Sequence, residues 1–440
     1  MAQATRPARG MRDFLPEDVR RRDYVIGIVE DVYQRYGFEP LETPALENID
    51  TLTGKYGEEG NKLIFKVLRR GGHETSGETD LALRYDLTVP LARVVAEHRA
   101  KLPKFFKRYQ IQPVWRADRP ARGRFREFYQ CDVDAIGSDS PVVEVEMLAA
   151  VSDVLQRLGF NDFVIQLNHR ALLTALLTTA GIDAAMHATA LVAIDKLDRA
   201  GRDAVQADMV TRGVLPESAR ACLDAFEDKD TFDRRVLQHP LGSGASANLA
   251  EILRLAESTP GRGRVKLTPR LARGLSYYTG SIMEVTVPDL AGSLGGGGRY
   301  DGLIGMFSGE QIPACGFSLG LERILVVMTE RNMFPAHVAG GGADVMVSLF
   351  EGEPVEEALK LASELRAAGL RTELYPEPDK LGKQLKYAAA RGVKFVTVVG
   401  ADERARDEVT LKNMQTGEQT TVSRAEVAAR IPRPASRDSS

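Results

Sequence analysis

Two strand-like segments joined by a short loop constrain the fold of this chain more than any other feature. The segments cover residues 104–117 and 122–134, and the sequence DRPARG at residues 118–123 connects them. Pro120 and Gly123 favour a loop at this place, and so short a connection cannot hold the crossover that parallel strands need. The pattern therefore predicts an antiparallel hairpin rather than a strand–helix–strand unit.

The second segment has two unlike faces when it is read with the two-residue period of a strand. One face is mostly apolar and consists of Phe125, Glu127, Tyr129, Cys131 and Val133. The other face runs from cations through a ring and an amide to carboxylates, in the order Arg124, Arg126, Phe128, Gln130, Asp132 and Asp134. At about 3.3 Å per residue this polar face is roughly 30 Å long, enough for a nucleotide and a small amine laid end to end.

Each group on that polar face suits one part of such a ligand. Arginine is a forked donor for phosphate, Phe128 offers a flat surface to a base, and the carboxylates can pair with a cation. Arg116, on the first strand, can face the same surface. A solvated, charged sheet face or a general RNA-binding hairpin explains the pattern equally well. The hairpin alone therefore leaves the function open.

The composition is that of an ordinary globular protein with two or three domains. The 440 residues are too many for one core, and 43% of them are hydrophobic and 27% charged. The net charge of −3 gives no general attraction to nucleic acid, although residues 101–126 contain nine lysines and arginines against one acid. The three cysteines have no paired spacing, which indicates a reducing compartment and argues against zinc or disulfides. With no signal peptide and no apolar run of membrane length, we expect a cytoplasmic protein without a membrane partner.

The pattern of apolar residues changes several times along the chain, which indicates separate domains. Strand and helix patterns alternate near the C-terminus, as in a compact α/β domain, and a glycine run precedes them. The expected divisions are residues 1–169 and 259–333 for one domain, 170–258 for a mainly helical insertion, 334–343 for a linker, 344–431 for an α/β domain and 432–440 for a disordered tail.

Common nucleotide and nucleophile motifs do not account for the chain. There is no GxxxxGK[ST] sequence, which excludes a P-loop. The run GGGGRYDG at residues 295–302 lacks a following Rossmann helix, and it predicts a tight turn with positive φ or a close approach of backbone to ligand with equal weight. GFSLG at residues 316–320 matches a nucleophile elbow, but only His337 follows, inside the linker. We instead expect close packing there, with Glu322 and Arg323 opening a helix.

Two further segments carry groups suited to a binding site. LRYDLT places Asp86 and Thr88 two residues apart, so both side chains point to one side if the segment is extended. LARGLSYYTG offers Arg273, Tyr277 and Tyr278 beside a glycine. A tyrosine pair of this kind is more often part of a core than of a ligand site.

In combination these motifs resemble the histidyl-tRNA synthetases, a family of class II aminoacyl-tRNA synthetases, over nearly the whole chain. GFEPLETPALE is similar to the first motif of the class, which forms the dimer interface, around Pro44. VWRADRPARGRFREFYQCDVD is similar to the second motif and GFSLGLERIL to the third. LRYDLT, RGLSYYTG and GGGGRYDG resemble motifs of the histidyl enzymes. The resemblance implies an α+β fold: an antiparallel sheet of six or seven strands with flanking helices, a helical insertion, and a C-terminal α/β anticodon-binding domain.

The resemblance also implies a reaction and a set of roles. The reaction is ATP-dependent attachment of L-histidine to tRNA(His) through a histidyl-adenylate, with release of AMP and diphosphate. The enzyme would be a homodimer, with Mg²⁺ accompanying ATP and diphosphate and no fixed metal site on the protein. The implied roles are Arg116 and Arg126 on the ATP phosphates, Phe128 and Arg323 around the adenine, Asp86, Thr88 and Gln130 on the α-amino group, Asp134, Tyr277 and Tyr278 around the imidazole, and Arg273, with Arg116, as the catalytic cation.

Two departures and two rival interpretations accompany the resemblance. Ser276 stands where the family commonly has aspartate, and Ala121 where many bacterial members have glutamine. The regulatory subunit of ATP phosphoribosyltransferase resembles the catalytic domain and senses histidine, but it typically lacks the anticodon-binding domain and the intact second motif. A pure RNA-binding module would bind tRNA without using ATP.

Overall fold

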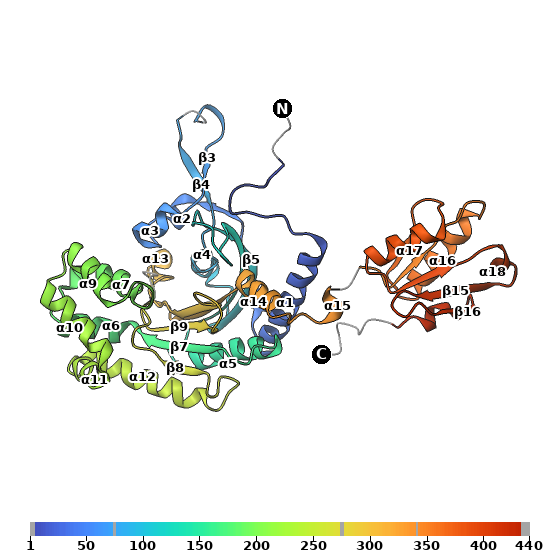
Figure 1. The fold of residues 1–440 in the computed structure, drawn as a ribbon. Coiled ribbons are helices and arrows are strands. Elements are labelled where there is room, and N and C mark those ends of the chain that lie inside the picture. Colours follow the sequence, from blue (N-terminus) through green and yellow to red (C-terminus); the bar gives the residue numbers. More distant parts are fainter. Residues whose placement is uncertain (1–4, 74–75, 273–276, 340–341, 433–440) are drawn as a thin grey trace. The chain divides into compact units, whose positions relative to one another are not determined.

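The computed structural model describes residues 5–73, 76–272, 277–339 and 342–432. The chain forms two compact units, Met1–Met333 and Phe334–Ser440 (Figure 1). Arg273 and Ser276, both named above, lie outside the described residues. In the part of the chain that the structure describes, no helix is long and apolar enough to cross a bilayer.

The first unit is built on an eight-stranded sheet (Figure 1). In spatial order its strands are β1 (Glu39–Pro40), β5 (Phe106–Trp115), β6 (Glu127–Ile136), β11 (Ala314–Gly320), β10 (Gly295–Arg299), β9 (Ser281–Thr286), β7 (Val164–His169) and β8 (Val265–Leu267). All neighbours are antiparallel except the outermost pairs, β1 with β5 and β8 with β7. The predicted α+β class is confirmed. The six or seven strands that the resemblance implied are too few, because the sheet also has short edge strands, β1 and β8, of two and three residues.

The predicted antiparallel hairpin is present, with a later start to its second strand. β5 and β6 pair from Phe106↔Ile136 to Trp115↔Glu127. β6 begins at Glu127, so residues 122–126 belong to the loop, where Ala121 and Arg124 form an isolated bridge. The polar face of the strand itself therefore carries a ring, an amide and two carboxylates, without the two arginines that the pattern placed on it.

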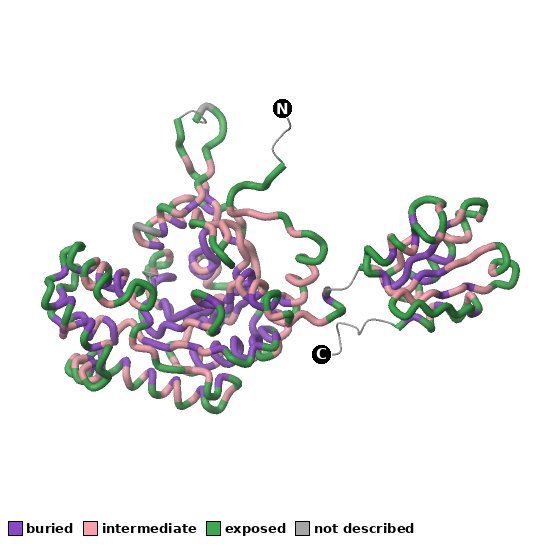
Figure 2. Tube along the Cα trace, in the orientation of Figure 1, coloured by how far each residue is buried: buried purple, intermediate pink, exposed green. Residues whose placement is uncertain are grey.

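Helices cover the sheet and bury most of its side chains (Figure 2). The longer ones are α1 (Pro16–Arg35), α4 (Thr88–His98), α5 (Pro141–Arg157) and α14 (Leu321–Glu330). Short helices are α2 (Ile49–Leu52), α3 (Gly57–Lys62), η1 (Gly71–His73) and α13 (Gly305–Ser308). A separate three-stranded sheet, in the order β2 (Leu46–Asn48), β4 (Thr79–Leu83) and β3 (Lys66–Leu68), was not expected from the sequence. Its β3–β4 hairpin projects from the unit in Figure 1.

A helical region connects β7 to its parallel neighbour β8. Its helices are α6 (Arg170–Thr179), η2 (Ala184–Met186), α7 (His187–Ile194), α8 (Leu197–Ala200), α9 (Arg202–Thr211), α10 (Pro216–Glu227), α11 (Lys229–Leu237) and α12 (Pro240–Ala256). The last of these packs against both α6 and α5, which joins the helical region to the helices of the sheet.

The glycine run is a strand, and the prediction of a tight turn there is wrong. Gly295–Arg299 form β10, between β9 and β11. A Cβ atom added at Gly297 would lie 2.1 Å from the carbonyl oxygen of Gly316, and one at Gly298 would lie 2.4 Å from that of Ser281. Glycine is needed here because the neighbouring strands approach too closely for any side chain.

The second unit is the α/β domain that the alternating pattern predicted. Its sheet has the order β13 (Thr372–Leu374), β12 (Val345–Val347), β14 (Phe395–Val398), β15 (Glu408–Asn413) and β16 (Gln419–Ser423). The helices are α15 (Ala336–Ala339), α16 (Val355–Ala367), α17 (Leu381–Ala390), α18 (Ala401–Ala405) and η3 (Val427–Arg430). Leu361 and Leu365 of α16 join one core and Ala388 of α17 joins another. Val345 belongs to the first core and Met346 to the second, as the alternation of a strand requires.

Candidate active site

A cavity of about 770 Å³ opens on the face of the large sheet, above β6, β10 and β11. Nine of the predicted site residues line it: Asp86, Thr88, Arg116, Phe128, Gln130, Asp134, Tyr277, Tyr278 and Arg323. The structure therefore brings together residues from four separate segments of the sequence. Tyr277 and Tyr278 are buried and also face the cavity, so the two interpretations of that tyrosine pair apply together.

Two predicted arginines stand apart from this group. Arg126 is not among the residues that line the cavity in the described parts of the chain. Its backbone N–H donates to the carbonyl oxygen of Gly10 at 2.7 Å, and its Nε donates to that of Asp118 at 3.1 Å. Arg124, in contrast, lines the cavity, where it is exposed and pairs with the Asp118 carboxylate at 3.1 Å. Arg273, the predicted catalytic cation, lies outside the described residues.

The floor of the cavity is the polar face of β6, where Asp134 is held on several sides. Its Oδ2 lies 2.7 Å from Arg108 Nη2, and the hydroxyl of Tyr300 donates to its Oδ1. A Cβ atom added at Gly316 would lie 1.9 Å from the same carboxylate, so glycine is required on the neighbouring strand. Burial raises the pKa of Asp134, and the charge of Arg108 opposes that rise. The result is a fixed acceptor at the deep end of the floor.

Asp132, two residues earlier on the same face, is less well compensated. It is 2% exposed, and its Oδ2 lies 4.0 Å from Arg108 Nη2. Burial, with the nearby charge of Asp134, raises the pKa of Asp132 to about 7, although Arg108 and the hydroxyl of Ser318 favour the charged form. Gln130 Nε2 donates to that Ser318 hydroxyl at 2.9 Å.

Asp86 forms a second buried carboxylate site at one side of the floor. It accepts hydrogen bonds from the hydroxyl of Tyr56 at 2.9 Å, the backbone N–H of Val89 at 3.0 Å and the hydroxyl of Tyr277 at 3.3 Å. Burial raises its pKa. Asp86 and Thr88 both line the cavity, but not because the segment is extended: Thr88 is the first residue of α4.

The other end of the cavity is cationic and aromatic. Arg116 follows β5 directly, and its Nε donates to the carbonyl oxygen of Tyr85 at 2.9 Å. Its guanidinium carbon lies 4.3 Å from the ring centroid of Tyr85 and 5.1 Å from that of Phe128. These contacts orient both the cation and the ring, which suits a phosphate beside a planar base.

Arg323 also lines the cationic end of the cavity, and its neighbour Glu322 binds the backbone of β6. Arg323 Nη1 donates to the carbonyl oxygen of Ser293. Both oxygens of Glu322 accept the backbone N–H of Tyr129, at 3.0 and 3.2 Å, just beyond the last pair of β6 with β11. Burial raises the pKa of Glu322 to about 7, and this backbone bond and the charge of Arg12 oppose the rise. As predicted, both residues open α14.

Sequence reasoning did not select Arg108, Tyr300 or Glu322 as working parts of the site. It gave Asp132 only the general role of a carboxylate that can pair with a cation. Arg108 was counted within a basic stretch, yet it is fully buried beneath the carboxylates. The available signal was its position opposite Asp134 in the hairpin, which depends on the strand register.

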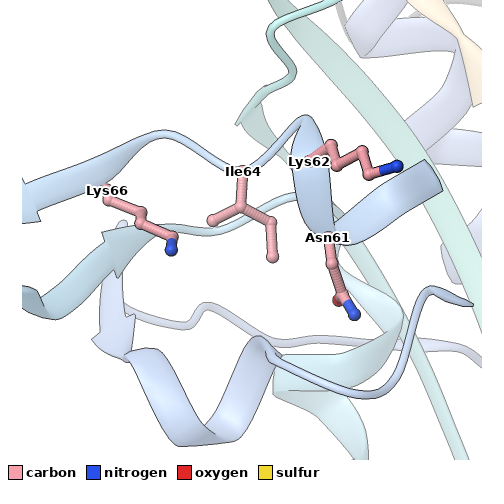
Figure 3. A pocket seen from close by; sticks show the side chains of 4 residues that line it. All are labelled: Asn61, Lys62, Ile64 and Lys66. Atoms are coloured by element: carbon pink, nitrogen blue, oxygen red, sulfur yellow. The ribbon is translucent and has the colours of Figure 1, made fainter. Parts of the chain in front are cut away.

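A second hollow, of about 630 Å³, lies away from these groups (Figure 3). It is lined by Asn61 and Lys62 at the end of α3, Ile64, and Lys66 of β3. These four residues offer two lysine amines but no carboxylate and no aromatic ring, and none of them is a predicted site residue.

The large cavity can hold a zwitterion and a nucleotide in one line. Its carboxylate end suits an ammonium group and a polar ring, and its arginine end suits phosphates and a base. An antiparallel sheet that carries both ends on one face is the arrangement of a class II aminoacyl-tRNA synthetase. The family description "Histidyl-tRNA synthetase" matches residues 10–324, and "Anticodon binding domain" matches residues 344–433. The chain belongs to the histidyl-tRNA synthetase family.

Full-length relatives agree with this assignment. The histidine–tRNA ligase of Porphyromonas gingivalis is 43% identical over 438 residues, which cover 93% of this chain and 95% of the relative. That of Gloeobacter violaceus is 42% identical, covering 94% of this chain and 95% of the relative. The crystal structure of histidyl-tRNA synthetase from Nostoc sp. PCC 7120 superposes with a TM-score of 0.80 at 30% identity, covering 97% of this chain and 99% of that one.

Proposed function

We propose that this protein attaches L-histidine to tRNA(His) at the expense of ATP, in two steps at the large cavity. In the first step a carboxylate oxygen of histidine attacks the α-phosphorus of ATP, the bond to the β-phosphate breaks, and diphosphate leaves. In the second step a hydroxyl of the terminal ribose of tRNA attacks the carbonyl carbon of the histidyl-adenylate, and AMP leaves. Family membership and relatives of this name at about 40% identity support the proposal.

The proposed roles of the described residues are those that the family resemblance implies. Asp86, Thr88 and Gln130 bind the α-amino group of histidine, while Asp134, Tyr277 and Tyr278 surround the imidazole. Arg116 binds the phosphates, and Phe128 and Arg323 enclose the adenine. Little covalent work falls to the protein, because fixed cations and correct positioning stabilise the charge that develops during phosphoryl transfer.

Several further assignments are part of the same proposal. Arg126 binds phosphate and Arg273 is a catalytic cation at the α-phosphate. ATP would bring Mg²⁺, which prefers phosphate oxygens as ligands, and the ion would supply positive charge against the diphosphate. The C-terminal α/β domain reads the anticodon of tRNA(His). The enzyme is a cytoplasmic homodimer.

One observation carries the choice of reaction. Buried carboxylates and an amide lie in the same cavity as Arg116, Phe128 and Arg323, on one face of one sheet. An RNA-binding surface needs the cations and the ring but not a buried site for an amine. A site that must hydrogen-bond both ends of its amino acid can reject analogues lacking one of those groups by roughly 10⁴-fold.

The test is exchange of labelled diphosphate into ATP, measured with each of the twenty amino acids in turn. We expect exchange with histidine alone, and loss of most of it in Arg116→Ala, because the developing charge then lacks a fixed cation. Charging of bulk tRNA follows as the second measurement. Histidine binding without exchange would contradict the ligase and point instead to a histidine sensor.

A further inference from the structure

In the described part of the chain, two neighbouring buried acceptors on the floor of the cavity lack both a hydrogen bond and a close cation. Gln130 and Asp132 follow each other on one face of β6 and are 8% and 2% exposed. Among the residues that the structure describes, neither Gln130 Oε1 nor Asp132 Oδ1 accepts a hydrogen bond. Leaving a buried acceptor unpaired is costly. Such a pair inside a cavity therefore indicates a ligand that supplies the missing donors.

The other two carboxylates that line the cavity are better compensated by the protein. Asp86 accepts three hydrogen bonds from the protein. Asp134 Oδ1 accepts a hydrogen bond from the hydroxyl of Tyr300, and its Oδ2, although it accepts no hydrogen bond from the described residues either, forms a close ion pair with Arg108. Arg108 lies 2.7 Å from Asp134 but 4.0 Å from Asp132, so its charge is directed mainly to the former. Asp132 is the carboxylate of the floor whose charge the protein compensates least.

The chemistry of the two acceptors selects the kind of group that fits them. An amide oxygen beside a charged carboxylate calls for a cation with several N–H donors. A primary ammonium group has three donors and a full charge. A neutral imidazole has one donor, and Asp134 at the deep end of the floor is available to it.

We propose that Asp132 binds the α-ammonium group of histidine directly, together with the side-chain oxygen of Gln130. This inference rests on the proposed ligase activity and adds a residue that neither the motifs nor the relatives assign. It makes Asp132 a determinant of specificity for the amine. The ammonium group supplies the charge and the donors that the empty floor lacks.

The test compares wild type with Asp132→Asn, which keeps the shape of the side chain and removes its charge. Binding of three ligands is measured by calorimetry without ATP: L-histidine, L-histidinol, which keeps the ammonium and the ring, and 3-(imidazol-4-yl)propionate, which lacks the ammonium. We expect the variant to bind histidine and histidinol about 10- to 100-fold more weakly, the usual loss for a charged hydrogen bond. Binding of the propionate and the KM for ATP in the exchange assay should not change.

A control and a stability measurement separate binding from structural support. Asp198→Asn removes the same charge from an exposed residue of α8 that also lines the cavity. It should leave histidine binding unchanged, because solvent screens an exposed charge. Empty Asp132→Asn protein should melt at the same temperature as wild type or higher, because it no longer buries a poorly compensated carboxylate.

Each alternative outcome is distinct. Equal weakening of histidinol and the propionate would assign Asp132 to the ring or to the pocket as a whole and overturn the proposal. Unchanged histidine binding in Asp132→Asn, or a lower melting temperature with equal losses for all ligands, would also overturn it. Wild-type protein that binds histidine but shows no exchange would contradict the ligase activity alone, since the calorimetric comparison does not depend on catalysis.

Discussion

At the scale of single residues, Asp132 gives the stability of the empty protein a pH dependence of its own. Burial raises its pKa to about 7, whereas an aspartate in an unfolded chain has a pKa near ~3.9. The folded protein therefore binds this proton more tightly than the unfolded chain does. The stability that Asp132 contributes is present below about pH 4 and is lost as the pH rises to about 7.

Thermal melting of wild type and Asp132→Asn without ligand measures this effect. The melting temperature of the variant minus that of wild type should increase between about pH 4 and about pH 7 and then stay constant. Glu322, whose pKa is also raised to about 7, is present in both proteins and cancels in the difference. A difference that does not vary with pH would show that Asp132 remains charged throughout.

The two-residue period of β6 was sufficient to place Gln130, Asp132 and Asp134 on one face before any coordinates. The period could not show which residues contact these three side chains, because those contacts depend on the register between neighbouring strands. Asp134 lies opposite Arg108 on β5 and opposite Gly316 on β11. These partners are distant or unremarkable in the sequence, and only the paired sheet brings them to the same carboxylate.

At the scale of elements, the segment before α1 supports the nucleotide end of the cavity. The guanidinium carbon of Arg12 lies 4.5 Å from the ring centroid of Phe14 and 4.0 Å from that of Phe125. Arg12 Nη2 is 3.6 Å from Glu322 Oε1. Because Glu322 also holds the backbone of Tyr129, Arg12 acts on both strand β6 and helix α14 through one carboxylate.

Replacing Arg12 tests this support. Arg12→Ala leaves Glu322 buried without its cation, so we expect the KM for ATP to rise by about tenfold and more than the KM for histidine. Arg12→Lys keeps the charge but not the planar contact with the rings, and should give an intermediate value. Exchange kinetics measure both constants, with the exposed neighbour Arg9→Ala as the control. Equal KM values for ATP in Arg12→Ala and wild type would show that the segment before α1 does not support the nucleotide end of the cavity.

Elements were predictable where their side chains show a period and hidden where they do not. The hairpin strands and the helices of the C-terminal domain are long enough to show one. Strands β1 and β8 have two and three residues. The first four residues of β10 are glycines, which have no side chain to form a pattern. The sequence did not show that β10 is a strand. The structure shows it, because β9 and β11 pair with β10 and lie too close to it for side chains.

At the scale of the whole molecule, the two units have separate cores. The C-terminal unit buries its own apolar residues on both faces of its five-stranded sheet. We therefore expect that a chain ending at Met333 keeps histidine-dependent exchange of diphosphate into ATP but charges tRNA much more slowly. Both activities are measured on the same preparation. Loss of exchange together with charging would show that the adenylating site depends on the C-terminal unit.

During synthesis of the chain, the cavity can form only after β6 has paired with β11. Asp134 pairs with Gly316 across the entire helical region, and Gln130 pairs with Gly320. Closing so long a loop carries an entropic cost that only the finished sheet repays. During synthesis the hairpin can form early, but its carboxylate face stays open to water until β11 has left the ribosome. Ligand binding therefore cannot assist the early folding of the first unit; it can stabilise only a sheet that is already complete.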